Sequence, residues 1–113
     1  MIYIASPYTH DDPDIMDHRF SQVRALTIAL IEDGLTPFSP IVYCHEMAKH
    51  ANFPRDAVFW QKLNASMLRR CDSMMVLQLP GWKTSHGVQW EISMAMALHI
   101  STVYIAVKPN ANN

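Results

Sequence analysis

The sequence predicts an α/β fold: a single domain with three layers, α/β/α, around a mostly parallel sheet of four or five strands. Three segments are apolar without polar alternation, which is typical of strands buried on both faces of a parallel sheet. Segments with apolar residues at helical spacing separate them, and strands that alternate with helices form right-handed crossovers. The length of 113 residues fits one compact domain.

The first strand is expected at 2–5, where IYIA is apolar and β-branched. The polar, proline-broken loop SPYTHDDPD follows. A helix is then expected at about 15–33, with Gly34 just beyond its end. A short second strand is expected at 35–39, with Pro37 at a sheet edge or at a strand end, because proline lacks the N–H donor that a central strand needs.

A short helix is expected at 41–50, directly after a proline. Asp56 is expected to cap a further helix through AVFWQKLNASMLRRC. The segment SMMVLQL, at 73–79, predicts a nearly continuous apolar strand, which ends at the pair Pro80–Gly81.

The last helix is expected over HGVQWEISMAMALHI, with Ser85 as its N-cap, and 102–107 is expected to form the final buried strand. The element order is therefore β-α-β-α-α-β-α-β. Ligands of such sheets bind outside the carboxyl ends of the strands. This rule directs attention to the loops at 6–14, 39–45 and 80–87.

Composition excludes several classes of function. The formal charge is −1 and no basic stripe is present, so we expect no binding to nucleic-acid polymers. No apolar run approaches the roughly 20 residues that span a bilayer, so we expect no membrane association. The two cysteines, Cys44 and Cys71, are typical of reduced packing residues. We therefore expect a cytoplasmic protein.

Glu91 is the first candidate for chemistry. It lies about six residues into the last predicted helix, beside an apolar stripe formed by Val88, Ile92, Ala95 and Leu98. A charge at such a position is costly unless it is paired or functional, and the positive end of the helix favours the ionised, nucleophilic form. The alternative interpretation is an ordinary, solvent-exposed glutamate.

The residues before Glu91 suggest an anion site. Ser85 and Gly87 offer a hydroxyl and approachable backbone N–H groups at a helix start, as phosphate-binding helices do. Ser85 can equally be a simple N-cap. His86 is the one histidine inside this segment, and its alternative role is that of a surface residue.

The loop after the first strand offers further hydroxyl groups. Ser6, Tyr8 and Thr9 can point into the same crevice, or they can satisfy their own backbone in a proline-containing turn. Tyr3 lies inside the strand, where tyrosine is usually a core residue, but its hydroxyl needs a partner and a carboxylate would serve.

Metal and cofactor sites are not predicted. His45 and His50 are five residues apart, which does not place two ligands on one helix face. Three glycines are too few for a dinucleotide fingerprint or a phosphate-cradling loop. We expect a protein that needs no metal and no redox cofactor.

Four segments together carry a family resemblance: IYIASPYTH, PFSPI, LNASMLRRCDSMMVL and PGWKTSHGVQWEISMAMAL. They resemble the nucleoside 2-deoxyribosyltransferase-like superfamily, in particular its small bacterial and phage branch, which is related to nucleoside 5′-monophosphate N-glycosidases. The likeness covers most of the chain and implies a flavodoxin- or Rossmann-like arrangement.

The superfamily pattern of serine, any residue, glycine, two or three residues and glutamate is reproduced by SHGVQWE. The resemblance implies that Glu91 is the nucleophile, that Ser85 contacts a nucleotide phosphate or sugar, and that Tyr3 orients the nucleophile. Asn64 stands where the family usually has an acid/base aspartate, and an amide cannot donate a proton as a carboxylic acid does.

Three alternatives follow from this departure. Asn64 only positions the base, or His86, Asp56 or Asp72 supplies the proton, or the chain has lost the reaction. Of these acids, Asp72 is better suited to stabilising the entry to a strand or a turn.

The expected function is cleavage of the N-glycosidic bond of a (deoxy)nucleoside or nucleoside 5′-monophosphate through a covalent glycosyl-Glu91 intermediate. Hydrolysis is favoured over base transfer. The resemblance also implies a homodimer or higher homo-oligomer, and Trp82 and Trp90 would suit ligand stacking, an interface or core packing. The rival expectations are a nucleotide-binding or sensing module, and an interaction domain without a ligand, in which Glu91 would be exposed.

Overall fold

The computed structural model describes residues 1–53 and 57–107, which form one four-stranded, fully parallel sheet in the order β2-β1-β3-β4. The strands are β1 (Ile2–Ala5), β2 (Pro37–Phe38), β3 (Ser73–Gln78) and β4 (Ser101–Ala106). The helices are α1 (Pro13–Glu32), α2 (Pro40–Ala48), α3 (Ala57–Leu68) and α4 (His86–Ala97). The strand order is that of flavodoxin-like sheets, so the predicted fold class is confirmed.

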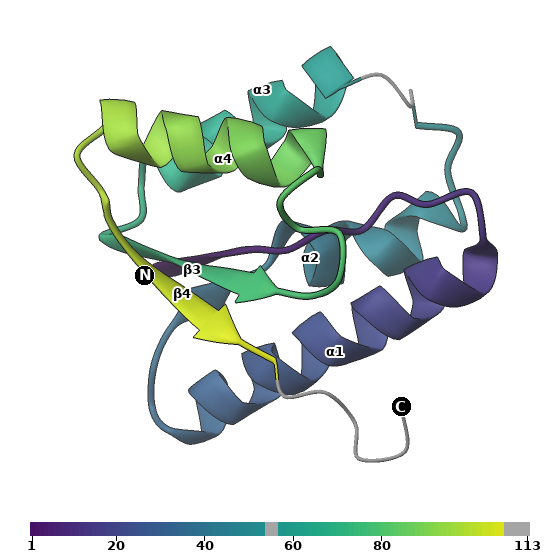
Figure 1. The fold of residues 1–113 in the computed structure, drawn as a ribbon, viewed down its shortest axis with the longest axis horizontal. Coiled ribbons are helices and arrows are strands. Elements are labelled where there is room, and N and C mark those ends of the chain that lie inside the picture. Colours follow the sequence, from purple (N-terminus) through teal and green to yellow (C-terminus); the bar gives the residue numbers. More distant parts are fainter. Residues whose placement is uncertain (54–56, 108–113) are drawn as a thin grey trace.

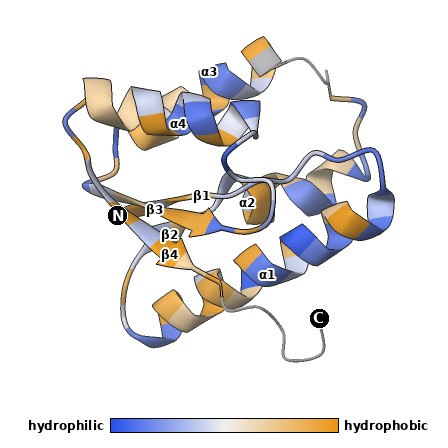
Figure 2. Cartoon of the chain, in the orientation of Figure 1, coloured by the Kyte–Doolittle hydropathy of each residue, from blue (hydrophilic) through white to orange (hydrophobic). Residues whose placement is uncertain are grey.

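Helices cover both faces of the sheet, α3 and α4 on one and α1 and α2 on the other (Figure 1). Successive side chains of β1 point to opposite faces. Tyr3 packs in a core cluster with Val88 of α4, whereas Ile4 packs in a second cluster with Val23 of α1. The apolar strands between the two helical layers stand out in Figure 2, and these two clusters explain why the strands lack polar alternation.

Local signals set the helix boundaries. The side chain of Asp12 accepts a hydrogen bond from the Asp14 N–H at 2.9 Å, so α1 begins at Pro13, two residues before its predicted start. Gly34 follows α1 with a φ of 83°, and its N–H and that of Leu35 bond to carbonyls of the last turn. This is the glycine-terminated helix end that the sequence predicts.

Prolines also determine where the second strand lies in the sheet and where the helix after it begins. β2 is two residues long and lies at the edge of the sheet, where the missing N–H of Pro37 is tolerated. The Ser39 hydroxyl accepts from the Val42 N–H at 3.1 Å and caps α2, whose first residue is Pro40. Asp56, the predicted cap of α3, lies outside the described residues.

The prediction that the last strand is buried is wrong. β4 is an edge strand, and its side chains Val103 and Tyr104 are 49% and 46% exposed. An apolar run predicts a strand, but it does not reveal that the strand is outermost and has a neighbour on one side only.

Two further structural findings concern the helices and the cysteines. Among residues 1–53 and 57–107, no helix has the length and apolar character needed to cross a membrane. Cys44 and Cys71 are both free thiols, as the sequence predicts, and Cys71 belongs to the core cluster under α3 and α4.

Candidate functional site

The candidate site lies at the carboxyl edge of β1 and β3. These neighbouring strands run parallel, and Ala5 at the end of β1 pairs with Val76 of β3. The strand order reverses here, because β1 also pairs with β2 on its other side. The loops at 6–12 and 79–85 therefore leave the sheet side by side, at the kind of position where open α/β sheets bind ligands.

Glu91 is buried on the inward face of α4, with only 7% of its surface exposed. It shares the inward face of α4 with Val88 and Ala95, which are fully buried. Burial removes the carboxyl from water and raises its pKa from 4.5 to about 8, while the neighbouring Tyr3 hydroxyl acts in the opposite direction. The interpretation of Glu91 as a solvent-exposed glutamate is therefore wrong.

The helix start is expected to favour the ionised form of Glu91, but burial has the larger effect in the ligand-free protein. With a pKa of about 8, most of the carboxyl is protonated at neutral pH. The field of a helix end acts mainly on the first turn, and Glu91 lies more than one turn beyond the N-cap Ser85. Desolvation therefore dominates the charge state of this group.

Tyr3 is the nearest functional neighbour of Glu91. The side chain is fully buried in β1, and its ring lies 6.0 Å from that of Phe38. Burial and then the charge of Glu91 raise the pKa of the Tyr3 hydroxyl well above its usual range. The hydroxyl makes no regular hydrogen bond within the described residues, although it faces Glu91 closely enough for each group to shift the pKa of the other.

Replacing Tyr3 by phenylalanine is expected to raise the pKa of Glu91 further, because the hydroxyl that favours its ionised form is lost. The free energy of unfolding at pH 9 should therefore fall below that of the wild type, because the ionised carboxylate has lost the hydroxyl that favours it. Urea denaturation between pH 5 and 9 measures both effects. Tyr43→Phe, at an exposed position of α2, is the matched control. An unchanged pH profile in Tyr3→Phe would contradict the assignment.

Three predicted site residues carry buried polar atoms without a partner in the described part of the chain. These atoms are Tyr3 Oη, Ser6 Oγ and Asn64 Oδ1. Buried polar groups are nearly always hydrogen-bonded, and leaving one unpaired costs about 1–3 kcal/mol. Such groups are expected where a protein keeps donors and acceptors ready for a ligand. Ser6 follows β1 directly, whereas Asn64 belongs to α3.

The start of α4 is open to solvent. The Ser85 hydroxyl accepts from the Val88 N–H at 3.3 Å, so its predicted capping role is confirmed, and its contact with phosphate stays a prediction. His86 and Gly87 are exposed in the first turn. A Cβ atom added to Gly87 would have a single near neighbour, the Ser85 hydroxyl at 3.9 Å, so space remains beside the backbone here.

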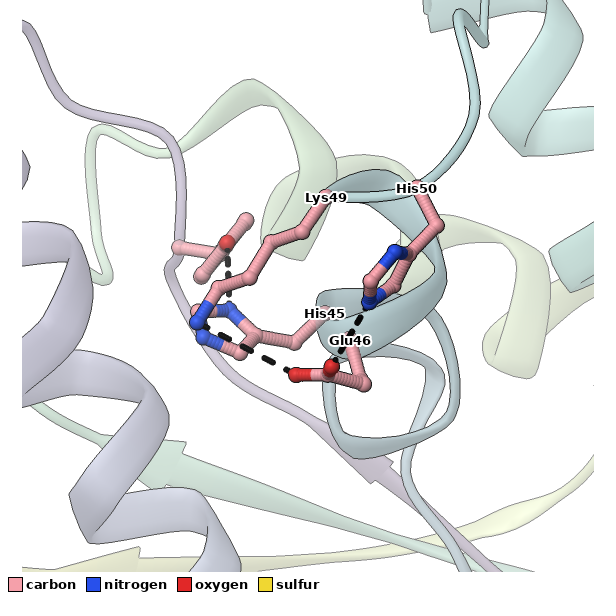
Figure 3. Close-up of polar contacts among 5 residues, drawn as sticks. His45, Glu46, Lys49 and His50 are labelled. Carbon is pink, nitrogen blue, oxygen red and sulfur yellow. Dashed lines mark hydrogen bonds and ion pairs between the residues drawn. The ribbon is translucent and has the colours of Figure 1, made fainter.

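Tyr8 is held by a pairing that the sequence did not reveal. Its hydroxyl lies 2.7 Å from Nδ1 of His45, which belongs to α2 and is 8% exposed (Figure 3). The His45 ring stacks on Phe20 of α1 at 3.7 Å, and burial lowers its pKa. Tyr8 is thus tied to the α1–α2 side of the site.

The polar residues at the end of α2 and just beyond it form a separate surface group. His50 lies 3.0 Å from the Glu46 carboxylate, and Lys49 lies 4.0 Å from the same side chain (Figure 3). Within the described residues, no three side chains of the metal-ligating types gather in one place.

The Trp82 side chain packs against the protein core. The side chain is half-buried against the core cluster beneath α4, and its ring lies 5.8 Å from that of Tyr104 in β4. The Lys83 ammonium lies 5.8 Å from the ring centroid. Of the roles proposed for Trp82, core packing is therefore observed, and ligand stacking stays a prediction.

The structure separates the three candidate proton donors. Asp72 precedes β3, and its exposed side chain is paired with the N-terminal amine at 2.7 Å. It stabilises the entry to β3, as the sequence suggests. Asp56 lies outside the described residues. His86 remains at the carboxyl edge, in the first turn of α4.

Arg19 of α1 links the loops after β1 and β3, a contact that sequence reasoning missed. Its guanidinium donates to the Thr9 carbonyl at 3.0 Å and to the Pro80 carbonyl at 3.1 Å. It borders a cavity of about 420 Å³, whose lining residues are His10, Ile15, His18, Arg19, Leu79, Pro80 and Gly81. An arginine within a polar helix segment gives no signal of a contact 61 residues away.

Comparison with known proteins supports the fold. A solved structure described as "2-desoxiribosyltransferase from Leishmania mexicana" matches 95% of this chain and 64% of that chain, with a TM-score of 0.58 and 24% sequence identity. The chain therefore spans 64% of the length of that protein, and the likeness shows a shared fold. No curated protein matches the sequence. A sequence family described as a domain of unknown function (DUF1937) matches residues 1–107, and the chain therefore belongs to this family.

Proposed function

We propose that the protein cleaves the N-glycosidic bond of a (deoxy)nucleoside or a nucleoside 5′-monophosphate. The observation that carries the proposal is the buried Glu91 carboxyl facing the Tyr3 hydroxyl, between α4 and a parallel sheet. The fold shared with a 2-desoxiribosyltransferase supports a nucleoside as the substrate class. The same likeness supports membership in the nucleoside 2-deoxyribosyltransferase-like superfamily.

In the proposed reaction the Glu91 carboxylate attacks the anomeric carbon of the sugar. The bond from this carbon to the base nitrogen breaks, its electron pair leaves with the base, and a glycosyl ester forms on Glu91. Water then attacks the same carbon, the bond from this carbon to Glu91 breaks and frees the carboxylate, and the proton that water releases is taken up by the departed base, which completes hydrolysis. A second base in place of water gives base transfer, and we favour hydrolysis.

The buried position of Glu91 suits this chemistry. The transition state carries oxocarbenium-like positive charge, and an adjacent carboxylate stabilises that charge more strongly where water is excluded. Tyr3 favours the ionised carboxylate and holds its orientation. Binding of a substrate that develops positive charge beside Glu91 lowers the cost of ionisation that burial imposes on the free protein.

Substrate contacts are assigned from the groups that face this edge. We assign the 5′-phosphate or the sugar to the N–H groups at the start of α4, with Ser85, His86 and Gly87 around them. Ser6 provides a buried hydroxyl, and Tyr8 and Trp82 provide aromatic surface beside the two loops. Asn64 orients the base, because its amide can pair with a base edge but cannot protonate it.

The expected assembly is a homodimer or higher homo-oligomer. Its support is the apolar surface near the β4 edge, where Val103, Tyr104 and Met96 are exposed. Residues that are apolar and exposed on an edge strand are typical of surfaces that another chain covers.

A nucleotide-binding or sensing module without catalysis is the second candidate function. The observation that favours it is Asn64, which places an amide where a proton donor would assist departure of the base. Under this alternative the orphaned polar groups would bind the nucleotide and the glycosidic bond would stay intact.

The decisive test is a panel of nucleosides and their 5′-monophosphates, incubated with the protein and analysed for free base by chromatography. We expect release of base from one substrate class, and calorimetry with the same panel should show its binding. Binding without base release would favour the sensing module. Absence of both would exclude the two candidates.

A further inference from the structure

A single side chain connects the two loops of the candidate site. Arg19 of α1 donates through Nη1 to the carbonyl of Thr9, in the loop after β1, and through Nη2 to the carbonyl of Pro80, in the loop after β3. The two carbonyls belong to segments 71 residues apart in the chain. A guanidinium presents its donors in a rigid planar fork, so it fixes the distance between the groups that it joins.

The positions of the two carbonyls give this connection a functional meaning. Thr9 directly follows Tyr8, in the loop that begins with Ser6. Pro80 opens the loop that leads through Trp82 to Ser85 at the start of α4. Arg19 therefore joins the loop that supplies hydroxyl groups to the loop that leads to the phosphate-facing helix start.

The backbone of the second loop is shaped around Arg19. Gly81 has a φ of 92°, and a Cβ atom added there would lie 2.7 Å from Arg19 Nη2. This distance is too short for any contact between these atoms, so a side chain at Gly81 would displace the guanidinium. Gly34 has a similar φ of 83°, but nothing lies within 4 Å of its added Cβ. The two glycines share the backbone conformation, and only Gly81 also leaves room for Arg19.

We propose that Arg19 is a positioning residue, which holds the loops after β1 and β3 at the separation that a bound nucleotide requires. The inference rests on the proposed function, because it assigns the nucleotide to the space between these loops. Arg19 acts on affinity through the two loop backbones and takes no part in the bond-breaking step. A lysine cannot replace it, because one ammonium does not present a fork to two carbonyls.

The first test uses the substrate that the nucleoside panel identifies. Arg19→Ala is expected to raise KM by about tenfold and to leave kcat unchanged. The dissociation constant measured by calorimetry should rise by the same factor. Arg19→Lys should resemble Arg19→Ala. Gly81→Ala should weaken binding to a similar extent, whereas Gly34→Ala should bind as the wild type does. If Arg19→Ala binds nucleotide with unchanged affinity, the inference is overturned.

A double-mutant cycle tests the coupling without any ligand. Gly81→Ala should lower the melting temperature more than Gly34→Ala does in the wild-type background, because it strains the backbone and also displaces Arg19. In the Arg19→Ala background the two glycine variants should lower it equally. If Gly81→Ala still lowers the melting temperature more than Gly34→Ala does in the Arg19→Ala background, the inference is contradicted.

A failure of the proposed function can be distinguished from a failure of the inference about Arg19. A wild-type protein that binds no nucleotide overturns the proposed function, and with it the role of Arg19 in affinity. A wild-type protein that binds nucleotide, together with an Arg19→Ala variant of equal affinity, overturns the inference alone.

Discussion

Glu91→Gln is expected to reduce release of free base on the order of 10³-fold or more, because it removes the proposed nucleophile. Glutamine has nearly the shape of glutamate, but its neutral amide neither attacks an anomeric carbon nor stabilises positive charge beside it. Glu91→Ala should lose activity to a similar extent. Chromatography of the free base, with the substrate that the panel identifies, measures the loss.

The matched control is Glu32→Gln, the same change at the exposed last residue of α1. It should keep wild-type turnover. Circular dichroism and thermal unfolding should show that Glu91→Gln is folded, so that the loss is chemical. Base release by Glu91→Gln at the wild-type rate would refute the assignment of Glu91 as the nucleophile.

Local signals made the fold predictable. The apolar runs predicted three of the four strands, and Ser85 was predicted as the N-cap of α4, as its hydrogen bond with the Val88 N–H shows. Ser39 makes the same capping interaction at the start of α2, although only Pro40 marked that start in the sequence. These interactions join residues three positions apart, so they can be found by reading along the chain. The exposure of β4 depends on strand order, which is a property of the whole sheet.

The candidate site was predictable in part. Glu91 stood out because a carboxylate beside an apolar stripe needs an explanation, and its burial confirms the geometry behind that argument. The pairing of Tyr8 with His45, and the bridge from Arg19 to Pro80, join residues 37 and 61 positions apart. No local pattern encodes such contacts. The raised pKa of Glu91 was not predicted from the sequence, because it depends on the burial that tertiary packing produces.

The burial of the Glu91 carboxyl, which favours the proposed reaction, should lower the free energy of unfolding where the carboxyl is ionised. A carboxyl whose folded-state pKa lies above its unfolded-state pKa binds its proton more tightly in the folded protein. The fold is therefore favoured while the group is protonated, and it loses stability as the pH rises from about 4.5, where the unfolded chain ionises, to about 8, where the folded protein ionises. Groups held at a cost in stability are typical of functional sites.

Glu91→Gln should therefore unfold at higher urea concentration than the wild type at pH 8–9, and at about the same concentration at pH 4–5. The two pKa values differ by about 3.5, and each pKa unit corresponds to about 1.4 kcal/mol, so the difference in unfolding free energy should grow toward about 5 kcal/mol. Urea titrations at several pH values measure it.

The difference between the two proteins isolates Glu91 from other titrating groups. Burial also lowers the pKa of His45, which makes the fold less stable as the pH falls below the ordinary range of histidine. This contribution is common to the wild type and to Glu91→Gln, so it cancels in the comparison. Parallel stability profiles from pH 4 to pH 9 would mean that Glu91 ionises normally in the folded protein. A gain in stability at alkaline pH, together with the loss of base release, would identify Glu91 as a group kept for chemistry against the stability of the fold.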